Sequence, residues 1–297
     1  MKKKQKKVKV NNMAILIDGK KVSAEVKAEV AREVKLLNEK GISVCLAVVI
    51  VGEDPASKIY VRNKKRACEE CGIKSLEFAL PEDTSEKELL ELIDKLNKDK
   101  DVNGILVQMP LPKHLSEKAV IDAISPLKDV DAFTDANVGK IMIGSYNFLP
   151  CTPAGVMELL KSENIDIEGK NAVVIGRSNI VGKPMSMLLL HKNATVTICH
   201  SRTKDIASVC RNADIIVAAV GRRNFLTADM VKEGAVIVDV GINRDENGKV
   251  CGDVDFANVK EKASYITPVP GGVGPMTIAV LMKNTLKAAA MQRDIQE

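Results

Sequence analysis

The sequence lacks the residue types on which several classes of protein depend. It contains no tryptophan, aromatic residues make up 3% of it, and there are three histidines. Because single-stranded nucleic acid is bound largely by stacking its bases on aromatic side chains, this composition does not favour such a partner. No apolar run approaches the roughly 20 residues that a membrane-spanning helix needs. The sequence therefore predicts a soluble protein with no membrane partner.

The seven cysteines form no framework of disulfides, because their number is odd and their spacing is irregular. That pattern is typical of reduced thiols, and it predicts a cytoplasmic protein. Cys68 and Cys71 form the one C-x-x-C pair. A redox or metal site would need a second pair or clustered histidines, whereas His114, His191 and His200 are scattered. We therefore favour packing inside a helix for this pair, and no metal is predicted.

Positive charge is concentrated at the N-terminus. The formal net charge is +5, and the opening run MKKKQKKVK alone contains six lysines. The rest of the chain is near neutral, so nucleic acid is not indicated as a partner. The run lacks the apolar segment of a secretory signal. Residues 1–12 are predicted to form a disordered, solvated tail.

The length of 297 residues, 45% of them hydrophobic, is sufficient for the cores of two domains. In the second half, the short apolar runs AVVIG, TVTICH, DIIVAAVG and AVIVDVG alternate with helical stretches. This alternation predicts a doubly wound parallel sheet. The segment PCTP at 150–153 predicts a rigid boundary, with Thr152 as the N-cap of a helix and Pro153 as its first residue.

The segment NAVVIGRSNIVGKP at 171–184 has the order strand, tight turn, helix. In such a turn, glycines let the backbone approach a pyrophosphate, and the N-terminus of the helix attracts the anion. Gly176 and Gly182 would serve this purpose, with Arg177 and Ser178 between them. The spacing departs from G-x-G-x-x-G, so an ordinary turn between a strand and a helix is an equally good interpretation of this segment alone.

The end of the next predicted strand, TVTICH, bears on the choice of cofactor. NAD sites commonly carry an acid about 20 residues after the glycines, where it binds the ribose hydroxyls. Here His200, Ser201 and Arg202 end the strand instead. An arginine and hydroxyl groups suit a phosphate, so the sequence favours NADP over NAD. Exposure to solvent is the alternative for each arginine of the two segments.

Tyr60 and Lys64 lie four residues apart on a helix predicted over 55–71, with Asp54 as its N-cap. The face that they share is otherwise apolar. One interpretation of Lys64 is a stem packed on the core with its ammonium in water. The other is an ammonium held in a cleft, its pKa lowered by loss of hydration so that it can take up and return a proton.

Further candidates lie at strand ends and loops. Gln108 ends a buried strand predicted over 103–108, at the edge where open parallel sheets bind ligands, although a polar strand end is the alternative. Asp129 and Asp131 in KDVD could bind a metal, cap a turn or accept from a ligand. The loop VPGGVGPMT at 269–277 contains enough glycine and proline to lie against a flat ligand.

Seven sequence blocks, in their order along the chain, resemble the bifunctional methylenetetrahydrofolate dehydrogenase/methenyltetrahydrofolate cyclohydrolase family. They are YVRNK at 60–64, VQMPLP at 107–112, KDVD at 128–131, PCTP at 150–153, GRSNIVGKP at 176–184, DVGIN at 239–243 and PVPGGVGPMT at 268–277. The resemblance runs from about residue 15 to the last helix.

The resemblance implies a homodimer of two-domain α/β subunits with a folate cleft between the domains. The folate-binding catalytic domain is expected at 13–150, joined by a C-terminal helix at 280–297, and a Rossmann-like NADP-binding domain at 151–279. The implied activity is oxidation of 5,10-methylenetetrahydrofolate with NADP+, followed by hydrolysis of 5,10-methenyltetrahydrofolate to 10-formyltetrahydrofolate.

The match of motifs also implies roles for single residues. Lys64 is implied as the catalytic proton-transfer group, Gln108 as its partner, Tyr60 as a residue that stacks on or orients the folate, and Asp131 as the pterin ligand. The implied cofactor contacts are Gly176, Arg177, Ser178, Ser201 and Ile242, and Arg202 joins them as a candidate phosphate ligand. Further substrate contacts are implied at Val107, Met109, Pro270, Gly271, Gly272, Val273, Gly274, Pro275, Met276, Thr277 and Ile278.

Three positions depart from the family pattern: Met109 replaces a leucine, Ala132 replaces the glycine of KDVDG, and Arg66 replaces a lysine. None removes a reacting group, although Ala132 is expected to alter slightly how its loop presents Asp131.

Two alternatives to the bifunctional activity stay open. One is a dehydrogenase without cyclohydrolase activity, against which the lysine and glutamine argue. The other is a nucleotide-binding regulatory protein, since a fold alone does not establish chemistry.

Overall fold

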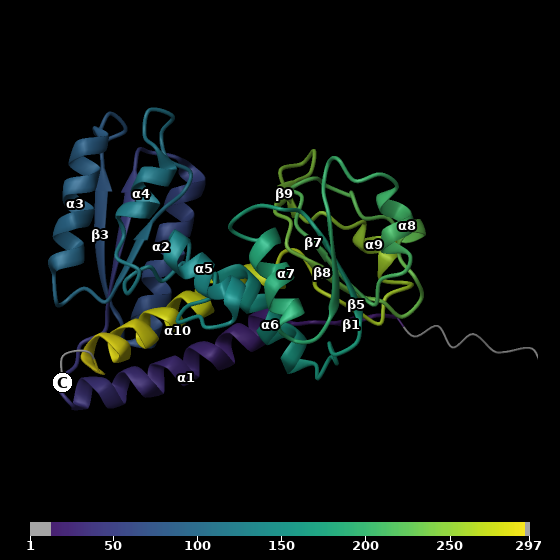
Figure 1. Ribbon diagram of the computed structural model, residues 1–297, viewed down its shortest axis with the longest axis horizontal. Helices are drawn as coiled ribbons and strands as arrows, with labels where there is room; N and C mark the ends of the chain where they lie inside the picture. The colour runs from purple at the N-terminus through teal and green to yellow at the C-terminus, as the bar shows by residue number, and fades with distance from the viewer. Residues whose placement is uncertain (1–12, 295–297) are drawn as a thin grey trace, which may run out of the picture.

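The computed structural model describes residues 13–294, so the tail predicted at 1–12 lies outside the described residues. Figure 1 shows two α/β lobes, one built on a three-stranded sheet and the other on a six-stranded sheet. All strand pairs of both sheets are parallel. The predicted α/β architecture with a doubly wound parallel sheet is confirmed.

The first lobe alternates strands and helices along the chain. Its elements are α1 Gly19–Glu39, β2 Cys45–Val51, α2 Pro55–Cys71, β3 Lys74–Leu80, α3 Glu86–Lys98, β4 Gly104–Val107, α4 Glu117–Ala123 and α5 Asp135–Ile143. The sheet order is β3-β2-β4. The central strand β2 is apolar and buried at every position, as expected where both faces of a sheet are covered. Ser85 caps α3 in a capping box with Glu88.

The second lobe has the sheet order β1-β11-β8-β7-β5-β6. Its strands are β1 Ile15–Leu16, β5 Asn171–Ile175, β6 Thr195–Cys199, β7 Ile215–Ala218, β8 Val236–Asp239 and β11 Tyr265–Ile266, and β9 Asn243–Arg244 pairs with β10 Val250–Cys251 as a separate hairpin. Its helices are α6 Cys151–Ser162, α7 Gly182–Leu190, α8 Ile206–Cys210, η1 Ala228–Met230 and α9 Phe256–Val259. The four apolar runs quoted from the second half thus form β5 to β8.

The two ends of the described chain each cross from one lobe to the other. β1 adds an edge strand to the second sheet, and α1 then runs back along the first lobe. The last helix, α10 Val273–Asp294, packs against α1, α2 and α6 (Figure 1). The domain ranges at 13–150 and 151–279 stay a prediction, but the pairing of β1 with β11 places residues 15–16 in the second sheet.

One local prediction is wrong. Thr152 does not cap a helix and Pro153 is not the first residue of one, because α6 begins at Cys151 with Pro150 as its N-cap and without a side-chain hydrogen bond. The Thr152 hydroxyl instead lies 2.9 Å from the Thr277 hydroxyl of α10. A threonine before a proline is a good cap locally, but here a tertiary hydrogen bond to another helix takes its place.

The predicted packing of the C-x-x-C pair is confirmed. Cys68 and Cys71 are buried on α2, and burial raises the pKa of Cys68 to about 12. A thiol with so high a pKa is a poor nucleophile and a poor metal ligand. Within residues 13–294, no group of histidine, cysteine and acidic side chains could hold a metal. No helix in the same residues is long and apolar enough to cross a membrane.

Candidate active site and cofactor-binding turn

Lys64 and Gln108 meet across the edge of the first sheet. Helix α2 starts where the Asp54 carboxylate accepts from the Ser57 N–H at 2.7 Å, and it carries Lys64 toward the carboxyl end of β4. There the Lys64 ammonium donates to Gln108 Oε1 at 3.0 Å. The amide of Gln108 is itself oriented, because its Nε2 donates to the Met109 carbonyl at 2.6 Å. The predicted pair is thus in contact, with the amide oxygen directed at the amine.

Asp131 completes this group from the loop after α4. Burial lowers the pKa of Lys64 below its usual value, and the Asp131 carboxylate opposes that shift. Burial likewise raises the pKa of Asp131, and the Lys64 ammonium opposes that rise. Burial therefore removes part of the hydration of each charge, and the opposite charge partly compensates for that loss. The Cys151 thiol also donates to Asp131 Oδ1 at 3.4 Å.

The two acids of KDVD have separate roles. Asp129 is buried and caps a turn, since its carboxylate accepts from the Phe133 and Thr134 N–H groups and from Asn137 Nδ2. Asp131 alone faces Lys64. Between the acid and the next helix, Ala132 has a φ of 58°, the left-handed conformation that glycine adopts at lower cost. The departure from KDVDG therefore stores strain beside Asp131, whose carboxylate interacts with the Lys64 ammonium.

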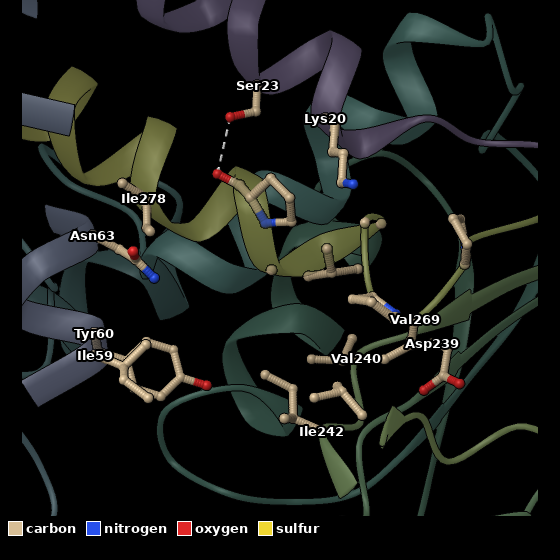
Figure 2. A pocket seen from close by; sticks show the side chains of 18 of the residues that line it. Lys20, Ser23, Ile59, Tyr60, Asn63, Asp239, Val240, Ile242, Val269 and Ile278 are labelled. Carbon is tan, nitrogen blue, oxygen red and sulfur yellow. Dashed lines mark hydrogen bonds between the residues drawn. The ribbon is translucent and has the colours of Figure 1, made fainter. Parts of the chain in front are cut away.

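A cavity of about 820 Å³ opens beside α2 and extends between the lobes. Tyr60, which keeps 40% of its surface exposed, lines it together with Asn63. Figure 2 shows the Tyr60 ring opposite the loops that carry Val240, Ile242 and Val269. The volume of the cavity lies within the range of roughly 300–1,000 Å³ that is typical of ligand pockets. The cavity lining does not include Lys64, Gln108 or Asp131. Tyr60 does line the cavity and lies one turn before Lys64 on α2, so it connects the cavity to the group formed by these three residues.

The loop at 268–272 and the first turn of α10 form the opposite wall. Lys20 N–H donates to the Gly271 carbonyl at 3.1 Å, and Ser23 Oγ donates to the Pro275 carbonyl at 3.1 Å, so α1 holds the loop in place. A side chain at Gly19 would place its Cβ 1.7 Å from the Gly272 carbonyl oxygen, so only glycine allows this approach.

The residues predicted to contact the folate divide into two groups. Pro270, Gly271, Gly272, Val273, Gly274, Pro275 and Ile278 line the cavity. Met276 is fully buried against Gly155, and Thr277 bonds to Thr152, so neither faces the cavity. Val107 is buried in β4 and Met109 is half-buried after Gln108, and neither lines the cavity.

The turn between β5 and α7 has the geometry of a phosphate-binding turn. Gly176 has a φ of 131°, and a Cβ added to Gly182 would lie 2.3 Å from the Gly176 carbonyl oxygen. Strand end and helix start therefore touch through backbone alone, an approach that a side chain at either glycine would prevent. Ser178 Oγ accepts from the N–H groups of Val181 and Gly182 at the start of α7.

The other predicted cofactor residues follow the carboxyl ends of neighbouring strands. Arg177, Ser201 and Arg202 are exposed beside β5 and β6. Ile242 is 56% exposed beyond β8, and it lines the cavity. The six predicted contacts therefore follow one edge of the sheet, and the last of them reaches the wall that Tyr60 faces.

Two buried acids that sequence reasoning missed hold the loops at this edge. Asp253 accepts from the backbone of residues 220–222 and from Asn243 Nδ2 at 2.6–3.0 Å. Asp239 accepts from the N–H groups of Gly241, Asp253 and Val254. Burial raises the pKa of Asp239 to about 6, although these hydrogen bonds oppose the rise. Their only sequence signal is that each acid adjoins glycine-containing turns.

Comparisons with known proteins agree with the geometry. Residues 17–131 match the family model of the tetrahydrofolate dehydrogenase/cyclohydrolase catalytic domain, and residues 150–293 match that of its NAD(P)-binding domain. The bifunctional protein FolD of Agathobacter rectalis is 62% identical over 276 residues, which cover 93% of this chain and 99% of that protein.

Two solved structures are similar over nearly the whole chain. The bifunctional FolD enzyme of Campylobacter jejuni has a TM-score of 0.93 and 55% identity, and the alignment covers 94% of this chain and 99% of that one. The methylenetetrahydrofolate dehydrogenase-cyclohydrolase of Trypanosoma brucei, complexed with NADP and an inhibitor, has a TM-score of 0.91 and 38% identity, with 96% and 100% coverage.

Proposed function

Because this chain belongs to the tetrahydrofolate dehydrogenase/cyclohydrolase family, we propose a mechanism for it in which Lys64 moves the protons of the hydrolytic step. The chain is a bifunctional enzyme of one-carbon folate metabolism. It oxidises 5,10-methylenetetrahydrofolate to the 5,10-methenyl compound with NADP+ and hydrolyses that product to 10-formyltetrahydrofolate. The resemblance stated from the sequence is thereby confirmed.

The residues of the second lobe fit NADP. The glycine turn at Gly176 and Gly182 lets a pyrophosphate approach the backbone at the start of α7, and the exposed Arg177, Ser201 and Arg202 supply donors for a further phosphate. When bound, NADP+ supplies the acceptor for the hydride that leaves the folate. The contribution of the protein to that step is to hold the two reactants in line and to exclude water.

The observation that carries the mechanism is the hydrogen bond of 3.0 Å between Lys64 and Gln108. Water must lose a proton as it adds to the methenyl carbon, and a ring nitrogen must gain one as the ring opens. A lysine with a lowered pKa can do both, because its neutral amine is populated nearer to neutral pH. Gln108 directs the amine, Asp131 accepts from the pterin, and Tyr60 orients the rest of the folate.

A spectrophotometric assay that follows the methenyl chromophore tests this function. With methylenetetrahydrofolate and NADP+, the chromophore should appear and then decay as the ring is hydrolysed. A protein that only bound the nucleotide would produce no chromophore. A dehydrogenase without the second activity would accumulate it.

The preference for NADP is expected to depend on Arg202. Its guanidinium can bind the phosphate that distinguishes NADP from NAD, so Arg202→Ala should raise the KM for NADP+ about tenfold and leave the KM for NAD+ unchanged. The matched control is Lys204→Ala, which removes a cation from an exposed position in the same loop. An equal rise of the KM for NADP+ and of the KM for NAD+ would show that Arg202 does not contact this phosphate.

A homodimer is proposed through the free edge of the first sheet. In the described residues β3 pairs only with β2, so one edge of its seven residues is open for a second strand. Lys74 N–H donates to the Val44 carbonyl, toward β2, so the N–H of Glu77, an odd number of residues further along, points outward. The same proposal places the enzyme in the cytoplasm, where its free cysteines would stay reduced.

Light scattering tests the dimer. The wild type should have twice the 32.2 kDa of one chain. Glu77→Pro removes an outward N–H without breaking a bond to β2, so it should give a monomer with unchanged helix content, whereas Glu77→Ala should stay a dimer. A proline variant that remains dimeric would exclude this strand from the interface.

A further inference from the structure

A buried asparagine lies in the middle of the last helix. Asn284 is 6% exposed, and around it α10 buries Leu281, Met282 and Leu286. Asparagine favours a helix less than leucine does, and a buried amide costs free energy unless its hydrogen bonds are made. The adjacent Thr285 hydroxyl is satisfied within the helix, where it donates to the Leu281 carbonyl. The amide of Asn284 instead bonds to other segments of the chain.

This amide joins two separate segments. Its Nδ2 donates to the Val130 carbonyl at 2.8 Å and to the Leu149 carbonyl at 2.9 Å. Carbonyls can only accept, so both of them face the NH₂ group of Asn284 and not its oxygen. Val130 directly precedes Asp131, and Leu149 directly precedes Pro150, the N-cap of α6. One side chain therefore ties the loop of Asp131 to the start of α6.

The loop of Asp131 needs an anchor of this kind. The Cys151 thiol lies 3.6 Å from the Val130 carbonyl and 3.4 Å from Asp131 Oδ1, and its single proton serves only one of them at a time. The next residue, Ala132, has the strained φ of 58°. Without the amide of Asn284, the Val130 carbonyl would keep only a weak, shared sulfur donor, and relaxation of Ala132 would move the loop.

Helix α10 also carries part of the cavity wall. Val273, Gly274 and Pro275 in its first turn line the cavity. Asn284 lies further along the same helix, about 15 Å from Gly274. Because one continuous helix bears both the wall and the anchor, the anchor fixes the distance from this wall to Asp131. A folate that extends from the cavity to Asp131 is aligned only if that distance is kept.

We propose that Asn284 is a positioning residue of the folate site, and that its amide holds the Asp131 carboxylate within reach of the pterin and of the Lys64 ammonium. The inference rests on the proposed function, because the place of Asp131 affects turnover only if the pterin and Lys64 lie beside it. Asn284 acts through Asp131 and takes no part in the proton transfers.

The alternative is that Asn284 merely attaches α10 to the first lobe, and Gln292 provides the comparison. Near the end of the same helix, Gln292 Nε2 donates to the Asn103 carbonyl at 2.7 Å and to the Leu127 carbonyl at 2.9 Å. Each of the two amides thus binds two backbone carbonyls outside α10. Of the two, Asn284 alone binds the residue next to Asp131.

The test compares Asn284→Leu with Gln292→Met in the full-length enzyme, because each substitution keeps the shape of the side chain and removes its donors. Asn284→Leu should raise the KM for methylenetetrahydrofolate about tenfold. The kcat of oxidation should change little, since a pterin ligand contributes to binding before and during hydride transfer. The KM for NADP+ should stay unchanged. Gln292→Met should lower Tm without raising either KM. If Asn284→Leu does not fold, Asn284→Ala replaces it.

The pH dependence of hydrolysis gives a second measurement. Two thiols and a second carboxylate are the other titratable groups around Lys64 and Asp131: Cys68, Cys151 and Asp129. The Asp131 carboxylate opposes the lowering of the Lys64 pKa by burial. A displaced carboxylate opposes it less, so in Asn284→Leu the pKa of Lys64 should fall further. The rise of the rate with pH should then begin at a lower pH than in the wild type, which a mere loss of stability would not cause.

The outcomes separate this role from the reaction itself. A folate KM and a pH profile in Asn284→Leu equal to those of the wild type would overturn the inference. The same changes in Gln292→Met would also overturn it, because any loosening of α10 would then produce them. A wild type whose hydrolysis does not depend on Lys64 would contradict the proposed mechanism instead, and the two folate KM values would then decide the role of Asn284.

Discussion

Replacement of Lys64 by alanine is expected to slow hydrolysis of methenyltetrahydrofolate by about 10²–10⁴-fold, the usual contribution of a positioned acid-base group. The amine is the group that Gln108 directs and Asp131 opposes in charge. Without it, neither proton of the ring-opening step has a carrier. Cofactor binding should be retained, because Gly176, Ser178 and Ser201 lie in the other lobe.

The measurement is the decay of the methenyl chromophore, with binding of NADP+ measured separately. In the wild type, the rate should rise with pH as the ammonium becomes the neutral amine, and this rise should begin below the usual range of lysine because burial lowers the pKa of Lys64. The Lys64→Ala variant should not show this rise of the rate with pH. Lys65→Ala, an exposed lysine on the same helix, is the control. Unchanged hydrolysis in Lys64→Ala would remove the residue from the mechanism.

The reacting group could be predicted because its parts have local sequence signals. Apolar runs placed the strands, prolines after Gln108 ended one of them, and helical spacing put Tyr60 and Lys64 on one face. The edge of a parallel sheet then brought Lys64 and Gln108 together. What the pattern left open was the fate of the ammonium, since a core lysine and a catalytic one have the same periodicity.

Other features could not be predicted, because they depend on contacts between distant segments. The two-residue β1 is too short to have a periodicity, and it forms only because β11 offers an open edge. Thr152 has a good local signal for a helix cap, yet it pairs with Thr277 from 125 residues away. Nothing in the sequence distinguishes Lys20 from the neighbouring Lys21. Only the contact of its side chain with the Gly271 loop in the folded structure does so.

Asp253 could likewise not be predicted from the sequence, because its partners come from distant segments. Of the substitutions considered, Asp253→Asn is expected to lower the free energy of unfolding the most. Asp253→Asn keeps the shape of the side chain but replaces one oxygen with an amide that can only donate. Each carboxylate oxygen accepts two N–H groups, Oδ2 from Val220 and Gly221 and Oδ1 from Arg222 and Asn243. Whichever way the new amide turns, its NH₂ faces two donors in a fully buried site.

Two buried donors without acceptors should lower the free energy of unfolding by about 3 kcal/mol, which corresponds to a fall in Tm of roughly 6–12 °C for a domain of this size. Calorimetry measures the change, and Asp255→Asn is the matched control because its carboxylate is not buried and accepts from Asn258 at 2.6 Å. The loops that Asp253 holds include the neighbours of Ile242, so the KM for NADP+ should rise about tenfold, by about 1.4 kcal/mol of lost binding. A stable variant with an unchanged KM would mean that the strand ends fix these loops without the carboxylate. A stable variant with a raised KM would instead confine the role of Asp253 to shaping the cofactor edge.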